Sequence, residues 1–218
     1  MKALKKTTLL VILRRNLFLA LAFSGLLWLC PEAGFSQSIP LLDSLSLDTA
    51  RIYTDLAQAL KEPDNVIRLS LRKQKLKEMP LEILKFRNLQ YLDLSKNNIK
   101  ELPAEIGELK NLQYFSIMKS DLEIFPPELG KLTNLKWLVM NQNEMILIPP
   151  QIGNLINLEY LDLWSNNLDH FPEELKNLKK LKTLDLRVIL ISDQDQARIA
   201  ALLPETKIYF SANCNCKN

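Results

Sequence analysis

Apolar residues return along this chain at a constant interval of 23 positions. One series is Leu69, Leu92, Phe115, Leu138, Leu161 and Leu184, and a second lies two residues later, at Leu71, Leu94, Ile117, Met140, Leu163 and Leu186. Apolar residues at alternate positions place their side chains on the same side of an extended strand. The pattern therefore predicts one short strand in each of six units, with both apolar side chains pointing inward.

A second apolar cadence follows each of the first five predicted strands. It comprises Leu76, Ile99, Leu122, Met145 and Leu168, then Met79, Leu102, Phe125, Ile148 and Phe171, each of the latter followed directly by a proline, at Pro80, Pro103, Pro126, Pro149 and Pro172. Self-similarity at a fixed period indicates one supersecondary unit repeated along the chain. A unit of this length cannot bury its own leucines, so the units must stack on one another to enclose them.

Polar residues after the strands fit such a stack. Asn97, Asn143 and Asn166 stand where a side-chain amide can bond to backbone groups of adjacent turns, so we interpret them as structural. Gln74 and Ser120 can replace them in this role, whereas Ile189 cannot, which suggests that the regular ladder ends there. Three glycines, Gly107, Gly130 and Gly153, are predicted where the opposite turn needs a permissive backbone.

Both ends of a stack need a cap to cover apolar surface and strand edges. Before the first repeat, residues 37–65 are expected to form a linker and a capping helix, with Ile52, Leu56, Ala59 and Leu60 on one face, Asp48 at its start and Pro63 at its stop. After the repeats of residues 66–191, residues 192–210 are expected to form a second cap. Ser192 and Asp195 open its helix, and residues 208–210 form its strand. Residues 211–218 form a polar tail.

These units spell the motif NLxxLDLSxNxLxxLPxxIGxL, most clearly over residues 88–109. In this motif the chain resembles the leucine-rich repeat family, in its 23-residue class. The resemblance implies an α/β fold, a right-handed horseshoe solenoid with a concave parallel sheet and short helical or irregular turns on the convex side. It also implies protein recognition, with no catalytic residue belonging to the repeat itself.

Within each strand, the residues between the buried leucines face the concave side. The sequence predicts a partner-binding face made of Tyr91, Asp93, Tyr114, Met118, Trp137, Val139, Tyr160, Asp162, Trp164, Asp185 and Arg187. Aromatic side chains in a line are typical interface anchors, and carboxylates beside them can set the partner's charge and orientation. Val139 and Trp164 are expected to be exposed on the unliganded sheet. Alternatively, tyrosine at the first column is repeat consensus that covers strand backbone.

Other functions remain open at this point. Aromatic platforms with nearby carboxylates also suit the sugar rings of a carbohydrate or of peptidoglycan, and a structural role in the cell envelope is a third possibility. Catalysis is disfavoured, because an open sheet is a poor place to raise a carboxylate pKa, and because His170, the single histidine, lies on a turn beside Asp169. The sequence indicates no cofactor and no metal site.

The first residues are typical of a secretory signal. A basic segment through Arg15 precedes an apolar run from 17 to 30, and Gly34 and Ser36 suit a signal-peptidase site. We expect residues 1–36 to be removed and the mature chain to be periplasmic, extracellular or in the cell envelope. An uncleaved membrane anchor is the alternative. Lipid attachment at Cys30 is disfavoured, because Trp28 and Leu29 precede it.

Charge and cysteine content add little to this picture. Of 28 basic and 25 acidic residues, five basic and one acidic lie in the signal segment, so the remainder is near neutral and does not favour nucleic acid as a ligand. Cys214 and Cys216 could form only a tight, strained disulfide. A redox or metal role competes with the simpler interpretation of two incidental thiols in a polar tail.

Overall fold

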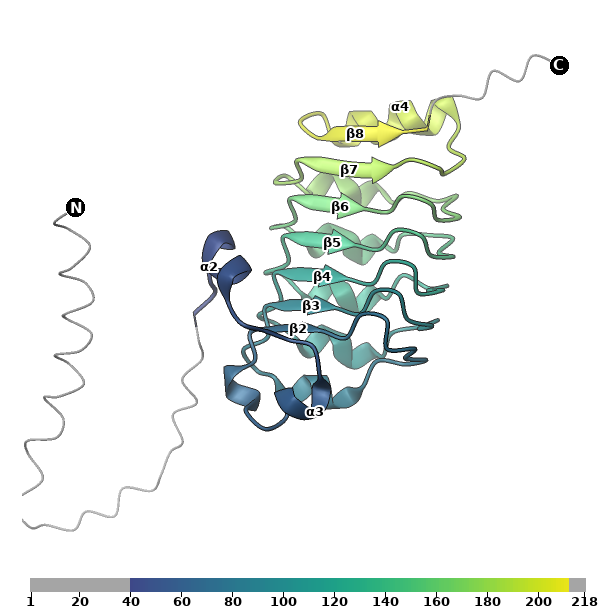
Figure 1. Cartoon of the computed structure of the whole chain (residues 1–218). Coiled ribbons are helices and arrows are strands. Elements are labelled where there is room, and N and C mark those ends of the chain that lie inside the picture. Colours follow the sequence, from purple (N-terminus) through teal and green to yellow (C-terminus); the bar gives the residue numbers. More distant parts are fainter. Residues whose placement is uncertain (1–39, 212–218) are drawn as a thin grey trace, which may run out of the picture. The chain divides into compact units, whose positions relative to one another are not determined.

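The computed structural model describes residues 40–211, in which eight parallel strands form a single sheet in chain order. The strands are β1 (Ile52–Tyr53), β2 (Arg68–Ser70), β3 (Tyr91–Asp93), β4 (Tyr114–Ser116), β5 (Trp137–Val139), β6 (Tyr160–Asp162), β7 (Thr183–Leu186) and β8 (Lys207–Phe210). Figure 1 shows them stacked from β2 to β8. The predicted solenoid, its six repeat strands and the strand predicted at residues 208–210 are confirmed, and β1 is an additional strand at the N-terminal end. The predicted signal segment and the cysteines 214 and 216 lie outside the described residues.

The strands are in register with the 23-residue period. Leu69 pairs with Leu92, and Leu92 with Phe115. Backbone hydrogen bonds continue beyond the named strands, since the Leu71 amide donates to the Asp93 carbonyl at 2.8 Å and the Lys73 amide donates to the Ser95 carbonyl at 3.1 Å. Each repeat is thus tied to the next one from its first strand residue to the following turn.

Short 3-10 helices form the opposite side of the stack. They are η3 (Leu81–Lys85), η4 (Ala104–Glu108), η5 (Pro127–Lys131), η6 (Pro150–Asn154) and η7 (Glu173–Asn177), with η2 (Pro63–Asn65) before the first repeat. The repeated proline is the N-cap residue of each of η3 to η7. Proline suits this place because its fixed φ sets the chain direction and no intrahelical partner exists there for a backbone amide.

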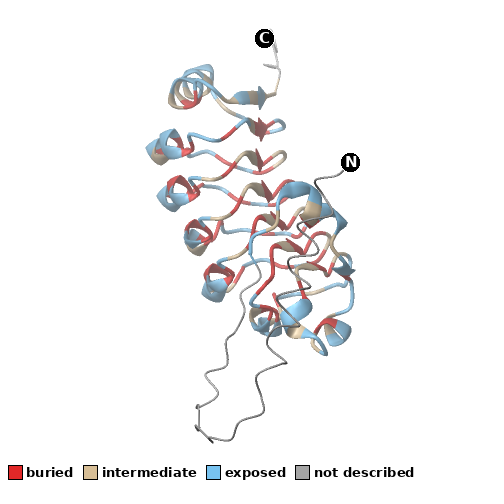
Figure 2. Ribbon diagram, turned by 90° about the vertical axis from the view of Figure 1, so that its left-hand side faces the viewer, coloured by how far each residue is buried: buried red, intermediate tan, exposed pale blue. Residues whose placement is uncertain are grey.

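The core lies between the sheet and these helices, as the side view in Figure 2 shows. The two leucine series of the strands are almost completely buried, and Phe86 and Phe115 are among the largest fully buried side chains. Burying a side chain of this kind contributes about 1.5–3 kcal/mol relative to leaving it exposed. The stack is therefore stabilised chiefly by contacts between successive repeats.

The predicted asparagine ladder is confirmed. The Asn97 side-chain amide donates to the carbonyls of Leu71 and Leu94 at 2.9 and 2.6 Å, and its oxygen accepts from the amides of Gln74 and Leu76 at 2.9 and 3.1 Å. Asn143 and Asn166 make the equivalent donor contacts two and three repeats further on. The side-chain amides of these asparagines are thus occupied by hydrogen bonds that join successive repeats.

The three glycines lie where the sequence predicted, but the predicted reason for them, a permissive backbone, is wrong. Gly107, Gly130 and Gly153 lie at or beside the 3-10 helices, and no glycine within residues 40–211 has a positive φ. What they provide is room: a Cβ on Gly130 would lie 2.5 Å from the Gln151 carbonyl oxygen, and one on Gly153 would lie 2.7 Å from the Glu174 carbonyl oxygen. Close approach of the next repeat requires the missing side chain.

The single N-terminal capping helix predicted from Ile52 to Leu60 is wrong. The structure has two short helices, α2 (Ser44–Thr49) and α3 (Leu56–Ala59), whose N-caps are Asp43 and Asp55, while Ile52 belongs to β1. Asp48 lies inside α2 and caps nothing. An exposed edge of β2 offers a ladder of backbone partners, and pairing with it outweighs the helical spacing of the apolar residues.

The C-terminal cap contains the elements expected of it. Helix α4 (Asp193–Leu202) has Ser192 as its N-cap, which accepts from the Asp195 amide at 3.1 Å and donates to the Asp195 carboxylate at 2.7 Å. Strand β8 follows and pairs with β7. Within residues 40–211, none of the helices has the length and apolar content needed to cross a bilayer.

Candidate partner-binding face

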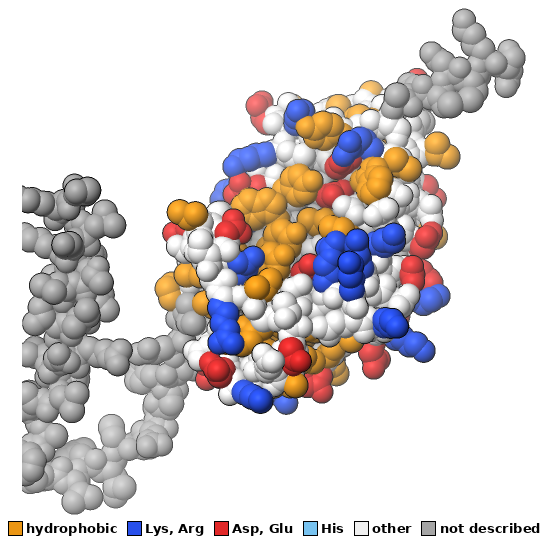
Figure 3. All heavy atoms as spheres, viewed as in Figure 1, with side chains coloured by type: hydrophobic (Ala, Val, Ile, Leu, Met, Phe, Trp, Pro, Cys, Tyr) orange, Lys and Arg blue, Asp and Glu red, His pale blue; other side chains and the backbone are white. Residues whose placement is uncertain are grey.

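The solvent side of the sheet carries a continuous row of aromatic side chains. Tyr91, Tyr114, Trp137 and Tyr160, which we call the aromatic row, pair in register across β3, β4, β5 and β6, and each is half-buried. Figure 3 shows hydrophobic side chains gathered across this face, which we call the sheet face. The structure thus brings together the four aromatic residues that the sequence placed in one column.

The first two rings of the row are stacked on each other. Tyr91 and Tyr114 lie with ring centroids 4.3 Å apart and planes 9° apart, and the Arg68 guanidinium lies 4.8 Å from the Tyr91 centroid. Burial raises the pKa of Tyr91 to about 12, with the neighbouring Tyr114 as the next cause. Both phenols therefore stay neutral at ordinary pH. The two tyrosine rings cover each other, and Arg68 lies over the ring of Tyr91.

The middle column of the sheet face, whose residues the sequence predicted to contact a partner, is buried. Val139 is 7% exposed, and Asp93, Asp162 and Asp185 are 6%, 8% and 5% exposed. Adjacent parallel strands are about 4.8 Å apart, so the larger side chains of the flanking columns close over these smaller ones. The expectation that Val139 would offer open apolar surface is therefore wrong.

The three aspartates instead bond to the backbone at the ends of their strands, where Asp93 and Asp162 are the last residues and Asp185 is the last but one. Asp93, Asp162 and Asp185 each accept a hydrogen bond from the backbone amide two residues later, at 2.9, 3.1 and 3.1 Å. Asp162 also accepts from the Asn141 side chain at 2.5 Å, and Asp185 pairs with Arg187 at 2.5 Å. Burial raises the pKa of the Asp162 carboxyl, although these donors oppose the shift. Internal donors thus occupy the carboxylates that were expected to orient a partner.

The third column provides accessible side chains. Met118 and Trp164 are half-buried and Arg187 is exposed, whereas Ser95 and Asn141, at the same position in other repeats, are buried. Together with Trp137 and Tyr160, Met118 and Trp164 form the apolar surface that a ligand on the sheet face can reach. Trp164, which the sequence predicted to be exposed, is half-buried.

Sequence reasoning missed that helix α2 lies against the sheet face. A pocket of about 270 Å³ is lined by Ser44, Leu47, Asp48, Tyr91, Tyr114 and Trp137. Leu47 is 5% exposed, although α2 is a single short helix beside the stack (Figure 1). The N-terminal segment therefore forms one wall of the aromatic row and leaves a small cleft next to it.

Two glutamines hold this segment in place. The Gln113 side chain donates to the Leu42 carbonyl at 2.8 Å, and the Gln90 side chain accepts from the Leu42 amide at 2.8 Å and donates to the Pro40 carbonyl at 3.2 Å. Both glutamines are buried. The signal was present in the sequence, because the same position of later repeats holds Lys136, Glu159 and Lys182.

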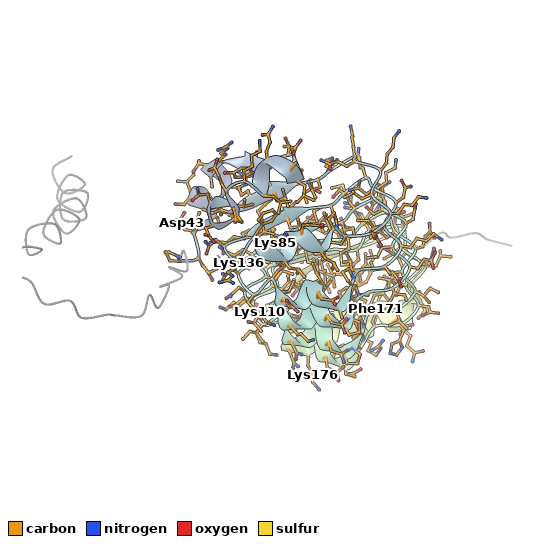
Figure 4. All side chains as sticks on the ribbon, turned by 90° about the horizontal axis from the view of Figure 1, so that it is seen from below. Asp43, Lys85, Lys110, Lys136, Phe171 and Lys176 are labelled. Carbon is orange, nitrogen blue, oxygen red and sulfur yellow. The ribbon has the colours of Figure 1, made fainter. Side chains whose placement is uncertain are left out.

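The charges around α2 are consistent with its position beside the sheet face. In Figure 4, which looks along the stack, Asp43 and Lys136 lie on the same side of the molecule, whereas Lys110 and Lys176 lie further from α2. The pKa of Asp43 is lowered, mainly by hydrogen bonds from the amide and side chain of Ser46, with a small contribution from Lys136. The cap of α2 is therefore an ionised carboxylate at neutral pH.

Other features of the surface add no further predicted site residue. A larger groove of about 720 Å³ lies along residues 75–82 and 101–103, away from the aromatic row. His170 takes part in an isolated bridge with Leu147. Within the described part of the chain, no three His, Cys, Asp or Glu residues are grouped closely enough to hold a metal ion.

The comparisons with known proteins agree with this geometry. The model of the leucine-rich repeat region matches residues 59–205. This chain belongs to the leucine-rich repeat family. A leucine-rich-repeat protein of Leptospira interrogans is similar, with 31% identity and a TM-score of 0.59 over 73% of this chain and 48% of that one. A comparison with curated proteins finds no match.

Two more solved structures of this family are similar. Internalin C2 of Listeria monocytogenes is 24% identical with a TM-score of 0.62, over 72% of this chain and 66% of that one, and it shows the fold alone. The ectodomain of the plant receptor kinase GASSHO1/SCHENGEN3 from Arabidopsis thaliana, in complex with Casparian strip integrity factor 2, is 25% identical with a TM-score of 0.53, over 73% of this chain and 19% of that one. The leucine-rich repeat chain described here thus spans about half of the Leptospira protein's length and about two thirds of internalin C2's.

Proposed function

We propose that this leucine-rich repeat chain is a non-catalytic module that binds a protein partner on its sheet face. The observation that carries the proposal is the half-buried aromatic row with Met118 and Trp164 beside it, on a side of the sheet that no helix of the repeats covers. Large aromatic side chains that are partly accessible are the usual anchors of protein interfaces. The plant ectodomain that resembles this chain is in complex with Casparian strip integrity factor 2, which supports a binding role here as well.

A carbohydrate ligand is the alternative, and the stacking of the tyrosines argues against it. A sugar ring packs on the open face of an aromatic ring, whereas Tyr91 and Tyr114 cover each other and Arg68 covers Tyr91. The faces of these two rings are therefore not open to a sugar, whereas a polypeptide can pack against aromatic side chains in other orientations. Protein recognition is therefore favoured over glycan or peptidoglycan binding, and over a purely structural envelope role.

The proposed contact surface combines three kinds of side chain. Trp137, Tyr160 and Trp164 provide aromatic anchors, Met118 provides an adaptable apolar surface, and Arg187 provides an exposed charge. Tyr91 and Tyr114 continue the aromatic row with the same partial exposure, and the remaining predicted residues support the surface from beneath: Asp93, Val139, Asp162 and Asp185. Neither a cofactor nor nucleic acid has a part in this proposal.

The test is capture of a partner by crosslinking from cells that produce the full chain, repeated with Trp164→Ala. We expect the substitution to weaken capture about tenfold or more, as the loss of an interface anchor does. Ile156→Ala, which removes an exposed apolar side chain away from the strands, serves as the matched control. Capture that is unaffected by Trp164→Ala and by Trp137→Ala, with folding intact, would overturn the proposal, and glycan-array binding would replace it with the alternative.

Export is a second part of the proposal. The basic and apolar segments before Ser36 are those of a cleavable signal, which would place the sheet face outside the cytoplasm. N-terminal sequencing of the secreted chain tests this directly. A mature protein that starts at Gln37 supports cleavage, and a chain that keeps residues 1–36 and fractionates with membranes supports the anchor.

A further inference from the structure

A cluster of four cations lies at the carboxyl end of the first strands. Arg72, Lys73, Lys96 and Lys119, which we call the basic cluster, come from three successive repeats. The backbone fixes their alignment, because the Lys73, Lys96 and Lys119 amides donate to the next repeat at 3.1, 2.8 and 2.9 Å. Equivalent residues of neighbouring repeats therefore follow one another at about the 4.8 Å spacing of adjacent strands.

The chain itself leaves this charge largely uncompensated. Among the ion pairs of residues 40–211, none involves Lys73, Lys96 or Lys119, and Arg72 only approaches Asp93, at 3.7 Å. The pKa of Lys96 is lowered, first by Arg72 and then by Lys73, with Lys119 as a smaller cause. Like charges held this close to one another repel, so an added anion would be favoured.

Nearby carboxylates are engaged elsewhere. Asp121 accepts from the Asn98 side chain at 3.3 Å, and Glu123 pairs with Lys100 at 2.8 Å. Asp93 accepts from the Ser95 amide at 2.9 Å and offsets part of the charge of Arg72 alone. The basic cluster is therefore a local positive surface on a body whose overall charge is near neutral.

The repeat fixes the backbone of these lysines in one recurring conformation. Lys73, Lys96 and Lys119 have φ values of 62°, 59° and 52°. This left-handed conformation favours glycine or asparagine and costs other residues about 1 kcal/mol or more. Three consecutive repeats place a lysine there, and the following repeats have Gln142, Ser165 and Val188 at the same position and in the same conformation.

The basic cluster adjoins the apolar part of the sheet face. Lys119 directly follows Met118 in the chain, and the Lys96 amide donates to the Met118 carbonyl at 2.8 Å. In Figure 3 a dense group of basic side chains lies immediately beside the hydrophobic band. A ligand lying across β3 to β5 would therefore contact apolar side chains over the strands and cations at the carboxyl ends of the strands.

From this juxtaposition we propose that the partner presents an acidic polypeptide segment, whose carboxylates lie on the basic cluster while an adjacent apolar side chain packs against Met118 and the aromatic row. This inference rests on the proposed function and adds the chemistry of the partner. A polypeptide is the ligand that carries carboxylates and apolar side chains on one short chain. An anionic polysaccharide would satisfy the cations and leave the apolar band uncovered.

Selection of a displayed random-peptide library on the full chain tests the inference. We expect the selected peptides to be rich in Asp and Glu next to Leu, Phe or Met. Synthetic copies should bind at least about tenfold more weakly to the triple variant Lys73→Glu, Lys96→Glu, Lys119→Glu than to the natural chain. Binding should also weaken as salt is raised, because the pairs lie at the surface.

The control carries the same charge change on the other side of the stack. Lys85→Glu, Lys131→Glu and Lys176→Glu lie in the last turns of η3, η5 and η7, and this triple variant should bind the peptides as the natural chain does. Glutamate keeps a side chain at each left-handed position, so the backbone strain of the first variant does not change. Circular dichroism of both variants checks that the fold is retained.

The other outcomes would overturn this inference without contradicting the proposed function, which has a separate test. Selected peptides that lack acidic residues, or that bind both triple variants equally, would show that a partner binds without using the basic cluster. Binding of polygalacturonate or heparin but of no peptide, lost in the first triple variant alone, would assign the cluster to a polysaccharide. A selection that returns no peptide would equally count against the inference.

Discussion

The two ends of the stack are closed in different ways. At the C-terminal end, α4 and β8 continue the repeat: Ile199 and Leu203 are buried, and β8 pairs with β7. At the N-terminal end, β1 and α3 close the core, but the segment before them turns back so that the buried Leu47 lines one pocket with Tyr91, Tyr114 and Trp137 of the sheet face. One end only seals the core, and the other also shapes the candidate binding face.

This difference shows that capping and shaping a ligand site are separable tasks. The C-terminal cap is encoded by local signals, a serine N-cap and an apolar face that continues the core. The N-terminal segment is held by Gln90 and Gln113, which come from the body of the stack. Substitutions at the two ends should therefore affect different properties.

The largest effect is expected at the C-terminal end. Ile199→Ala removes a fully buried side chain from α4, so the free energy of unfolding should fall by about 2–5 kcal/mol. Urea unfolding measures the change. Leu190→Ala, at a completely exposed position just before α4, should change stability by less than about 0.5 kcal/mol. Equal effects of the two variants would mean that α4 does not cap the core.

A smaller and local effect is expected at Leu47. Leu47→Ala should release α2 from the aromatic row at a cost of about 1–3 kcal/mol, because little else of α2 is buried. Hydrogen exchange should rise at residues 42–50 and stay unchanged in β5 to β7. The control is Leu45→Ala in the same helix, whose side chain is 76% exposed. Loss of protection throughout the stack would contradict the separation of the two tasks.

Gln113→Leu should have an effect of about 1 kcal/mol. The substitution removes the donor to the Leu42 carbonyl at 2.8 Å and to the Gln90 side chain at 2.9 Å, while keeping most of the buried volume. Faster amide exchange at Leu42, which bonds to Gln90, is the expected readout. Lys136→Leu, at the same position of the next repeat, should leave that amide unaffected.

The smallest effect concerns pH dependence in the C-terminal half of the sheet face. Burial raises the pKa of Asp162 above its usual value of 3.8, so folding favours the protonated carboxyl. That contribution to stability is present below pH 3.8 and is lost as the pH rises through the folded-state pKa. The difference in unfolding free energy between Asp162→Asn and the natural chain should therefore favour the variant more near about pH 7 than near about pH 3. The change in this difference should be less than about 1 kcal/mol. Urea unfolding at both pH values checks the sign, and a difference in the opposite direction would mean that the Asn141 and Trp164 donors outweigh burial.

Prediction from the sequence was most successful for what repeats. The register of the strands, the buried leucine series and the asparagine bonds follow from positions that recur at equal spacing, so each is supported several times over. Prediction was least successful where one segment departs from that spacing, as at Ile52, whose helical pattern with Leu56 and Ala59 concealed a strand. It also misjudged Val139, because exposure on a sheet depends on the size of the neighbouring side chains.

Periodicity alone thus determined the stack, its core and the alignment of Tyr91, Tyr114, Trp137 and Tyr160 on one side of a sheet, since every unit must bury the same apolar positions against the next. Only the tertiary structure decided which of those side chains stay accessible and that α2 stands beside them. The bond between Gln113 and Leu42 joins residues 71 positions apart, and although the glutamines depart from later repeats, a single contact of that kind leaves no period that would show which segment they bind.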